Sequence, residues 1–161
     1  MTKEITRTPA DSAIEMRQMV MPNHTNPQGT IFGGQVMGWI DIAAAMTAAR
    51  HANRPVVTAH IDSITFESPI KVGYHVHILA SVNYVGRTSM EIGVKVIGEN
   101  PANGDRRTAT TAYLTFVALD DFSKPTPVPR LQPITDDDKR RFNNAKKRVK
   151  HRLALKKSLS E

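Results

Sequence analysis

The chain has 161 residues, which fits one domain with or without a tail and is enough to bury a hydrophobic core without disulfides. It contains no cysteine, which excludes disulfide bonds, thiolate metal ligands and a cysteine nucleophile. The formal net charge is +7, and the excess lies in residues 124–161, with 12 Lys and Arg against 4 Asp and Glu. The first residues lack the apolar core of a signal peptide, so we expect a cytoplasmic protein.

The first third of the chain predicts a strand, a loop and a long helix. Residues 12–20 have mixed polarity and predict an edge strand, and residues 21–29 contain the Pro, Asn and Gly residues of a loop. Residues 34–52 are free of proline and rich in Ala, Met and Ile, which predicts a helix that Asn53 ends. Because this helix is apolar almost all round, we expect it to be buried, as a helix wrapped by a sheet would be. Its charged Asp41 argues against a membrane span.

The next sixty residues predict four strands. Apolar and polar side chains alternate over 74–84 and 90–96, which indicates strands with one buried face. Residues 56–66 and 107–119 are rich in β-branched and aromatic side chains and also predict strands. One buried helix against one antiparallel sheet is an α+β fold.

The end of the chain predicts a linker and a basic helix. Residues 124–133 contain four prolines, which indicates a linker. Three aspartates then precede apolar residues at roughly helical spacing, and acids at the start and bases at the end suit a helix dipole. We therefore expect a domain over 1–123, followed by a proline-rich linker and basic C-terminal helix over 124–161. The basic helix is either a solvated surface or a docking surface for polyanions such as CoA phosphates, nucleic acid or acidic lipid.

Four residues between positions 26 and 41 carry the chemistry. Asn26 lies in the loop, Gly33 and Gly34 open the helix, and Asp41 lies within it among apolar neighbours. Asn26 is either a turn former or a ligand for water or substrate, and the two glycines serve either packing or close approach to a ligand. A carboxylate in apolar surroundings is costly unless it is paired or faces water. Asp41 is therefore either a structural partner at an interface or a catalytic base in a cleft.

Together these groups indicate acyl transfer. The free amides at a helix N-terminus can hold a thioester carbonyl oxygen and the oxyanion that it becomes. A carboxylate can deprotonate a water or attack the carbonyl itself. Gly33 and Asp41 are 8 positions apart, about 12 Å along a helix that begins at the glycines. If both act on one substrate, they should come from different chains, with the site on a two-fold interface.

The sequence also resembles a known family. Residues 26–41, which read Asn-Pro-Gln-Gly-Thr-Ile-Phe-Gly-Gly and then Gln-Val-Met-Gly-Trp-Ile-Asp, resemble the hot-dog acyl-CoA thioesterases of the bacterial YciA and mammalian cytosolic acyl-CoA hydrolase type. Segments 62–66, 69–73 and 86–91 resemble the same family in the same order, and the likeness spans about residues 12–120. The resemblance implies a helix wrapped by a sheet, dimers with a continuous sheet and often trimers of dimers.

The resemblance implies roles for particular residues. It implies that Asn26 and Asp41 are catalytic and come from opposite subunits, and that the amide of Gly33 or Gly34 holds the oxyanion. It implies no metal and no cofactor beyond the coenzyme A that forms part of the substrate. The positions that it places along CoA or its phosphates are Lys71, Arg87, Thr88 and Ser89, although Arg87 read alone is as well explained as a solvated turn residue.

Two other kinds of function compete with acyl-CoA hydrolysis. An acyl-ACP thioesterase of the same fold would use another acyl carrier, and a non-catalytic acyl-CoA sensor or nucleic-acid binder would use the basic tail. A sensor has no need of the Asp41 carboxylate beside an anionic ligand, and the tail has one aromatic residue, Phe142, and no nucleic-acid motif. Six histidines without cysteine or a helical His-x-x-x-His pair do not predict zinc. We therefore expect a homo-oligomeric acyl-CoA thioesterase with no nucleic-acid or membrane partner.

Overall fold

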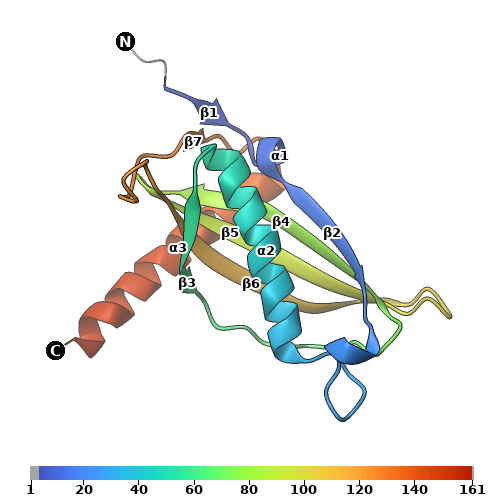
Figure 1. The fold of residues 1–161 in the computed structure, drawn as a ribbon. Helices are drawn as coiled ribbons and strands as arrows, with labels where there is room; N and C mark the ends of the chain where they lie inside the picture. The colour runs from blue at the N-terminus through green and yellow to red at the C-terminus, as the bar shows by residue number, and fades with distance from the viewer. Residues whose placement is uncertain (1–3, 161) are drawn as a thin grey trace.

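The long helix predicted over 34–52 spans Gly33–Ala52 and is α2 in Figure 1. The structure, a computed structural model, describes residues 4–160. Alanine favours the helix throughout its second half. Asn53 ends the helix in the left-handed conformation, with a φ of 51°, and its amide donates to the Ala49 carbonyl at 2.7 Å.

Five antiparallel strands form one sheet in the order β2-β4-β5-β6-β3. The alternating segments 74–84 and 90–96 form the central strands β4 and β5, and the segment 107–119 forms the third central strand, β6. The segment predicted as an edge strand lies at one edge. The strand that directly follows α2 lies at the opposite edge. The strand bounds are Ile14–Met19 (β2), Val56–Ile61 (β3), His75–Val85 (β4), Ser89–Glu99 (β5) and Arg106–Ala118 (β6). The minor elements are β1 (Thr6–Arg7), α1 (Pro9–Ser12), η1 (Pro22–His24) and β7 (Arg130–Leu131).

The strand predicted over 56–66 is shorter than expected. β3 ends at Ile61, after a register shift between Thr58 and His60. The chain then arches along β6, joined to it by backbone hydrogen bonds from the amides of Asp62 and Glu67, at 3.0 and 2.7 Å. Because this arch leaves the strand ladder, its side chains line a space beside the start of α2.

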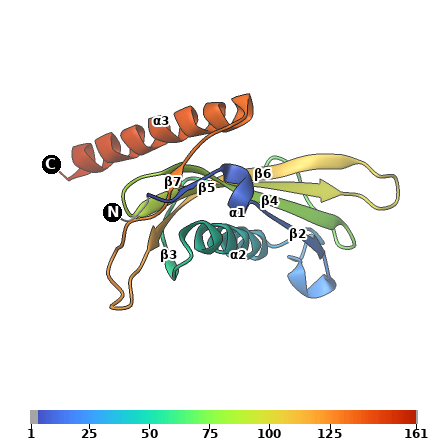
Figure 2. The ribbon, with the colours of Figure 1, turned by 90° about the horizontal axis from the view of Figure 1, so that it is seen from above.

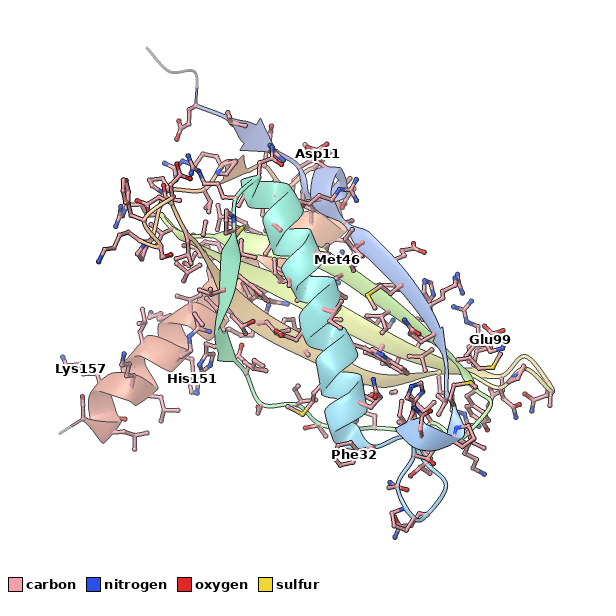
Figure 3. All side chains as sticks on the ribbon, viewed as in Figure 1. Asp11, Phe32, Met46, Glu99, His151 and Lys157 are labelled. Carbon is pink, nitrogen blue, oxygen red and sulfur yellow. The ribbon has the colours of Figure 1, made fainter. Side chains whose placement is uncertain are left out.

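One face of α2 packs on the sheet and the other face is open. Figure 2 shows α2 on one side of the sheet and the C-terminal helix α3 (Asp136–Leu159) on the other. The expectation of a helix buried almost all round is wrong for the single chain, because one sheet covers only one side. Met37, Ile42 and Met46 are 42%, 52% and 41% exposed and belong to the open face of α2, where Figure 3 labels Met46. A contiguous exposed apolar surface of this kind marks an interface.

The predicted linker is bound to the rest of the chain. Within it, β7 pairs in parallel with β1, and the Val128 amide donates to the Arg87 carbonyl at 3.0 Å. Helix α3 then follows and is capped by Thr135, whose hydroxyl accepts from the Asp138 amide at 3.0 Å while the Asp138 carboxylate accepts from the Thr135 amide at 3.0 Å. The predicted helix is therefore present, and the domain boundary at residue 123 stays a prediction. None of the helices within residues 4–160 combines the length and apolar character needed to span a membrane.

A partly buried ion pair attaches α3 to the outer face of the sheet. Arg148 Nε and Nη2 donate to the two carboxylate oxygens of Glu91 at 2.9 and 2.8 Å, and the Glu91 side chain is 2% exposed. Asn83 Nδ2 donates to the same carboxylate at 3.3 Å, and the guanidinium lies 3.5 Å from the centroid of the Tyr113 ring. Burial opposes the charged form of Arg148, but the hydrogen bonds and charge of Glu91 outweigh it and raise the pKa of Arg148.

His51, at the end of α2, joins that helix to the proline-rich segment. Its Nε2 lies 2.9 Å from the Pro129 carbonyl oxygen, so Nε2 carries the proton. Its Nδ1 is buried without a hydrogen-bond partner among the described residues. Burial lowers the pKa of His51, and the hydrogen bond to Pro129 offsets this only in part.

Removing one member of the ion pair should loosen α3 and destabilise the fold. Arg148→Ala leaves the Glu91 carboxylate buried without its cation, so we expect the free energy of unfolding to fall by about 3 kcal/mol. Denaturant unfolding at fixed protein concentration measures this. The Glu91→Ala/Arg148→Ala double variant should lose less than the two single variants summed, and strict additivity would show that the pair contributes nothing as a pair.

The buried His51 should make the protein less stable in acid. Because its pKa is lower in the folded than in the unfolded chain, the unfolded chain takes up the proton more readily, and stability falls as the pH drops below the unfolded value of 6.5. His51→Gln keeps a donor for the Pro129 carbonyl and cannot titrate. We expect this variant to show a shallower loss of unfolding free energy from about pH 7 to pH 5. Equal slopes for the two proteins would contradict the assignment.

Candidate active site

Asn26 closes the loop that precedes α2. Its Oδ1 accepts from the amides of Gln28 and Thr30 at 3.0 and 3.3 Å, and its Nδ2 donates to Thr30 Oγ1 at 2.9 Å. Gly29 takes a φ of +75° in the same turn, a conformation that favours glycine. Asn26 is therefore a turn former in this structure. Since its side-chain amide carries two hydrogens, one donor remains beyond the contact with Thr30.

His24 fixes this loop to the start of the helix. Its Nδ1 accepts from the Met21 amide at 3.0 Å, and its carbonyl accepts from the Phe32 amide at 2.8 Å. Its ring packs edge-on against Trp39, with the ring centroids 5.2 Å apart. The loop and the helix N-terminus are thus held together as one unit.

The helix begins with two amides that have no acceptor. Among residues 4–160 no hydrogen-bond acceptor faces the amides of Gly33 and Gly34, whereas the Gln35 amide donates to the Phe32 carbonyl at 2.9 Å. A Cβ on Gly34 would collide with the Phe32 ring, which lies over the helix start (Figure 3). Two free amides at the positive end of a helix can hold a carbonyl oxygen that becomes negatively charged.

A cavity lies beside Gly33 at the helix start. It has a volume of about 310 Å³ and is lined by Thr30, Gly33, Phe66 and Ile70 together with the arch between them. A larger cavity of about 480 Å³ lies on the opposite, outer face of the sheet, where Tyr113 belongs to its lining, and it contains none of the predicted catalytic groups. The smaller cavity therefore can place a ligand against the helix start at Gly33.

Asp41 lies on α2 beside its open face and is oriented by a threonine. The Asp41 side chain is half-buried, and its Oδ1 accepts from the Thr58 hydroxyl of β3 at 2.8 Å. Sequence reasoning missed Thr58, because nothing in the sequence states which strand residue faces the third turn of the helix. The neutral hydroxyl orients the carboxylate and leaves its charge in place, whereas a lysine or arginine would neutralise that charge.

The structure keeps Asp41 apart from the amides of its own chain. The helix begins at Gly33, as the prediction assumed, so Asp41 lies about 12 Å further along it. Asn26, Gly33 and Gly34 gather at the helix start, and Asp41 stands alone with Thr58 near the middle. A single chain therefore offers two half-sites.

The residues expected along CoA fall into two groups. Lys71 forms an isolated bridge with Thr30, so it lies beside the Asn26 loop. Arg87, Thr88 and Ser89 turn β4 into β5 at the far end of β4, which is 11 residues or about 36 Å long. The structure does not bring this turn to the helix start of the same chain. No group of three or more His, Asp or Glu side chains within residues 4–160 is placed to hold a metal.

Comparison with known proteins gives the family of the chain. Residues 28–104 match the Thioesterase superfamily. Over 161 residues the chain is 42% identical to the uncharacterized acyl-CoA thioester hydrolase YkhA of Bacillus subtilis strain 168, covering 96% of this chain and 94% of that protein.

Solved structures agree with this match. An acyl-CoA hydrolase from Staphylococcus aureus, solved with butyryl coenzyme A, coenzyme A and coenzyme A disulfide, is 39% identical with a TM-score of 0.90, over 96% of this chain and 94% of that one. Variants of that hydrolase with an aspartate, an asparagine or a threonine replaced by alanine have also been solved. A hexameric acyl-CoA thioesterase is 41% identical with a TM-score of 0.91, over 94% and 97% of the two chains. The α+β fold and the family expected from the sequence are confirmed, and the chain belongs to the hot-dog-fold acyl-CoA thioester hydrolases.

Proposed function

We propose that the protein hydrolyses acyl-CoA to a free acid and CoA at a site shared by two subunits. One observation carries this proposal: the oriented carboxylate of Asp41 and the free amides of Gly33 and Gly34 lie about 12 Å apart on one straight helix. Each half-site opens to a surface that a second chain can cover. A partner related by two-fold symmetry would place its Asp41 beside the Gly33 and Gly34 amides of this chain, and its own amides beside this chain's Asp41.

The chemistry follows from the two halves. The thioester carbonyl oxygen accepts from the Gly33 or Gly34 amide of one chain, beside the free side-chain donor of Asn26. In one route, Asp41 of the other chain takes a proton from a water that attacks the carbonyl carbon; the C–S bond then breaks, and the CoA sulfur leaves as the thiolate and takes up a proton. In the other route, Asp41 attacks the carbonyl carbon itself, the C–S bond breaks with loss of the CoA thiolate, and water then hydrolyses the resulting acyl anhydride and frees the Asp41 carboxylate.

The variants of the S. aureus hydrolase support these roles. Their replaced asparagine, aspartate and threonine are 15 and 17 positions apart, the same separations as Asn26, Asp41 and Thr58 in this chain. The asparagine variant was solved in complex with coenzyme A. That result supports a role for Asn26 in the reaction rather than in holding CoA.

The open face of α2 and the free edge of β3 supply the dimer interface. β3 is an edge strand with Val57 45% and Ile61 38% exposed, and pairing with a second β3 would continue the sheet. Such a dimer covers Met37, Ile42 and Met46 next to Asp41. A trimer of such dimers would give the hexameric state of the solved relative.

CoA would then run between the two chains. Lys71 beside the Asn26 loop is placed to meet a CoA phosphate, while Arg87, Thr88 and Ser89 must come from the partner, because their turn lies at the far end of β4. A cytoplasmic location, and the absence of cofactor, nucleic-acid and membrane partners, stay predictions.

Thr58 should act by positioning Asp41. Thr58→Val keeps the shape of the side chain and removes the hydrogen bond to the carboxylate, so we expect kcat to fall at least about tenfold with little change in KM. Thr58→Ser retains the hydroxyl and should recover most of the rate. Thiol release from butyryl-CoA measures both. A serine variant as slow as the valine variant would show that packing, not the hydrogen bond, matters.

Two inactive variants should complement each other if the site is shared. Asp41→Asn and Asn26→Ala should each lose at least about a hundredfold in kcat, because one lacks the base or nucleophile and the other lacks the loop donor. Mixed chains form heterodimers in which one of the two sites is intact, so part of the activity should return. The activity of the mixed chains should be measured on acyl-CoAs from acetyl to palmitoyl. The same measurement shows which acyl chain length the enzyme prefers.

The control is subunit exchange followed with a tagged chain. Exchange without any return of activity would place both groups in one chain and defeat the shared site. Near wild-type turnover by Asp41→Asn would defeat the chemical assignment itself.

A further inference from the structure

Two exposed phenylalanine rings flank the free amides at the start of α2. A Cβ on Gly34 would collide with the ring of Phe32, and a Cβ on Gly33 would lie 3.7 Å from Cε2 and Cζ of the Phe66 ring. Phe32 is 60% exposed and Phe66 is 47% exposed, so neither ring belongs to the hydrophobic core. Of the two, Phe66 lines the cavity beside Gly33 and Phe32 does not.

The two hydroxyl groups in the wall of this cavity already have partners within the chain. Asn26 Nδ2 donates to the Thr30 hydroxyl at 2.9 Å, and the Ser68 hydroxyl donates to the Thr108 carbonyl at 2.8 Å. An amide or hydroxyl of a ligand that is buried without a hydrogen-bond partner carries a large cost in free energy. The cavity therefore favours a part of the substrate that has no polar atoms.

The rest of the wall is apolar or negatively charged. Its apolar side chains are Ile31, Phe66, Pro69 and Ile70, and Ile70 is buried. Among the described residues that line the cavity, Glu67 alone carries a charge. Because a carboxylate repels the phosphates of CoA, this wall suits a hydrocarbon chain and opposes the phosphate-bearing end of the substrate.

The thioester carbonyl carbon has two substituents, which lead away from the amides in different directions. With the carbonyl oxygen on the amide of Gly33 or Gly34, the acyl chain leads to one side and the CoA sulfur to the other. In the proposed dimer CoA runs between the two chains, whereas residues of a single chain line this cavity. The cavity therefore lies on the acyl side of the carbonyl.

We propose that this cavity holds the acyl chain and that Phe66 determines the chain length that fits, an inference that rests on the proposed thioesterase function. Phe66 lies in the arch that follows β3 and runs past the start of α2 (Figure 1). Because its ring lies next to Gly33, the ring takes up space beside the carbonyl, and the acyl chain must pass it. The size of residue 66 thus sets how many methylene groups the cavity accepts.

Changing the size of residue 66 tests the proposal. Phe66→Ala should raise the ratio of kcat/KM for decanoyl-CoA to that for butyryl-CoA at least about tenfold, since each methylene that becomes buried changes the ratio about fourfold. Phe66→Trp should lower the same ratio. The matched control is Phe32→Ala, which removes a ring beside the same helix start but outside the cavity wall and should leave the ratio unchanged.

Three outcomes of these assays would overturn the proposal. The first is a ratio that stays at its wild-type value in both Phe66 variants. The second is a fall in kcat/KM by the same factor at every chain length, which would place Phe66 along CoA. The third is an equal change of the ratio in Phe32→Ala, which would show a general loosening of the helix start.

A chemical probe tests the contact without catalysis. The natural chain contains no cysteine, so Phe66→Cys carries a single thiol. The thioether S-decyl-CoA, which cannot be hydrolysed, should slow the reaction of this thiol with a maleimide about tenfold at about ten times its Kd, since about one site in eleven stays empty. S-methyl-CoA at the same multiple of its own Kd should leave the reaction within about twofold of the free protein, because its CoA part does not enter the cavity. Equal protection by the two thioethers would contradict the proposal.

Hydrolysis by the wild-type chain separates the two levels of the inference. If the wild type releases no thiol from any acyl-CoA from acetyl to palmitoyl, the proposed function fails and the acyl cavity fails with it. If the wild type is active but its length preference does not follow the size of residue 66, only the assignment of the cavity is wrong.

Discussion

The distance along one helix between a pair of free amides and a carboxylate is the constraint on which the rest of the structure depends. A straight α-helix places Gly33 and Asp41 about 12 Å apart, and no side-chain rotation brings both to one carbonyl carbon. The fold accordingly leaves the Asp41 side of the helix uncovered and ends the sheet beside it at an unpaired strand. Both features would be liabilities in a monomer.

The surroundings of Asp41 suit the catalytic role proposed for it. Its Oδ1 is held by the Thr58 hydroxyl, a neutral donor. A cationic partner would hold the carboxylate more strongly but would also reduce its basicity and its attack on carbon. Met37, Ile42 and Met46 surround the position with apolar surface. Once a second chain excludes water there, the carboxylate interacts more strongly with a proton or an electrophile.

Much of the fold could be predicted from the sequence because local patterns determine it. The apolar residues that alternate over 74–84 and 90–96 form the inner face of β4 and β5. Asn53 ends α2, as predicted. The rest depends on how elements meet. Tertiary packing decides which face of a uniformly apolar helix the sheet covers. It also decides that Thr58 reaches Asp41.

The ion pair was missed for a different reason. Glu91 alternates with apolar residues as a solvent-facing strand residue would, and Arg148 lies in a run of bases that resembles a solvated surface. Each side chain read alone predicts exposure. Glu91 is buried and Arg148 is partly buried only because α3 folds back over the outer face, where each supplies the charge that the other needs. The basic tail is thus solvated along most of its length and structural at the positions facing the sheet.

The nature of that attachment bears on the use of the helix. An apolar helix held by hydrophobic contact alone can slide or rotate, since such contact is not directional. The bidentate contact of Arg148 with Glu91, with the guanidinium stacked on Tyr113, fixes the rotation of α3 about its axis and its position along it. A helix fixed in this way holds its C-terminal end, which carries the exposed Leu155 and Leu159, in one direction past β3 (Figures 1 and 2).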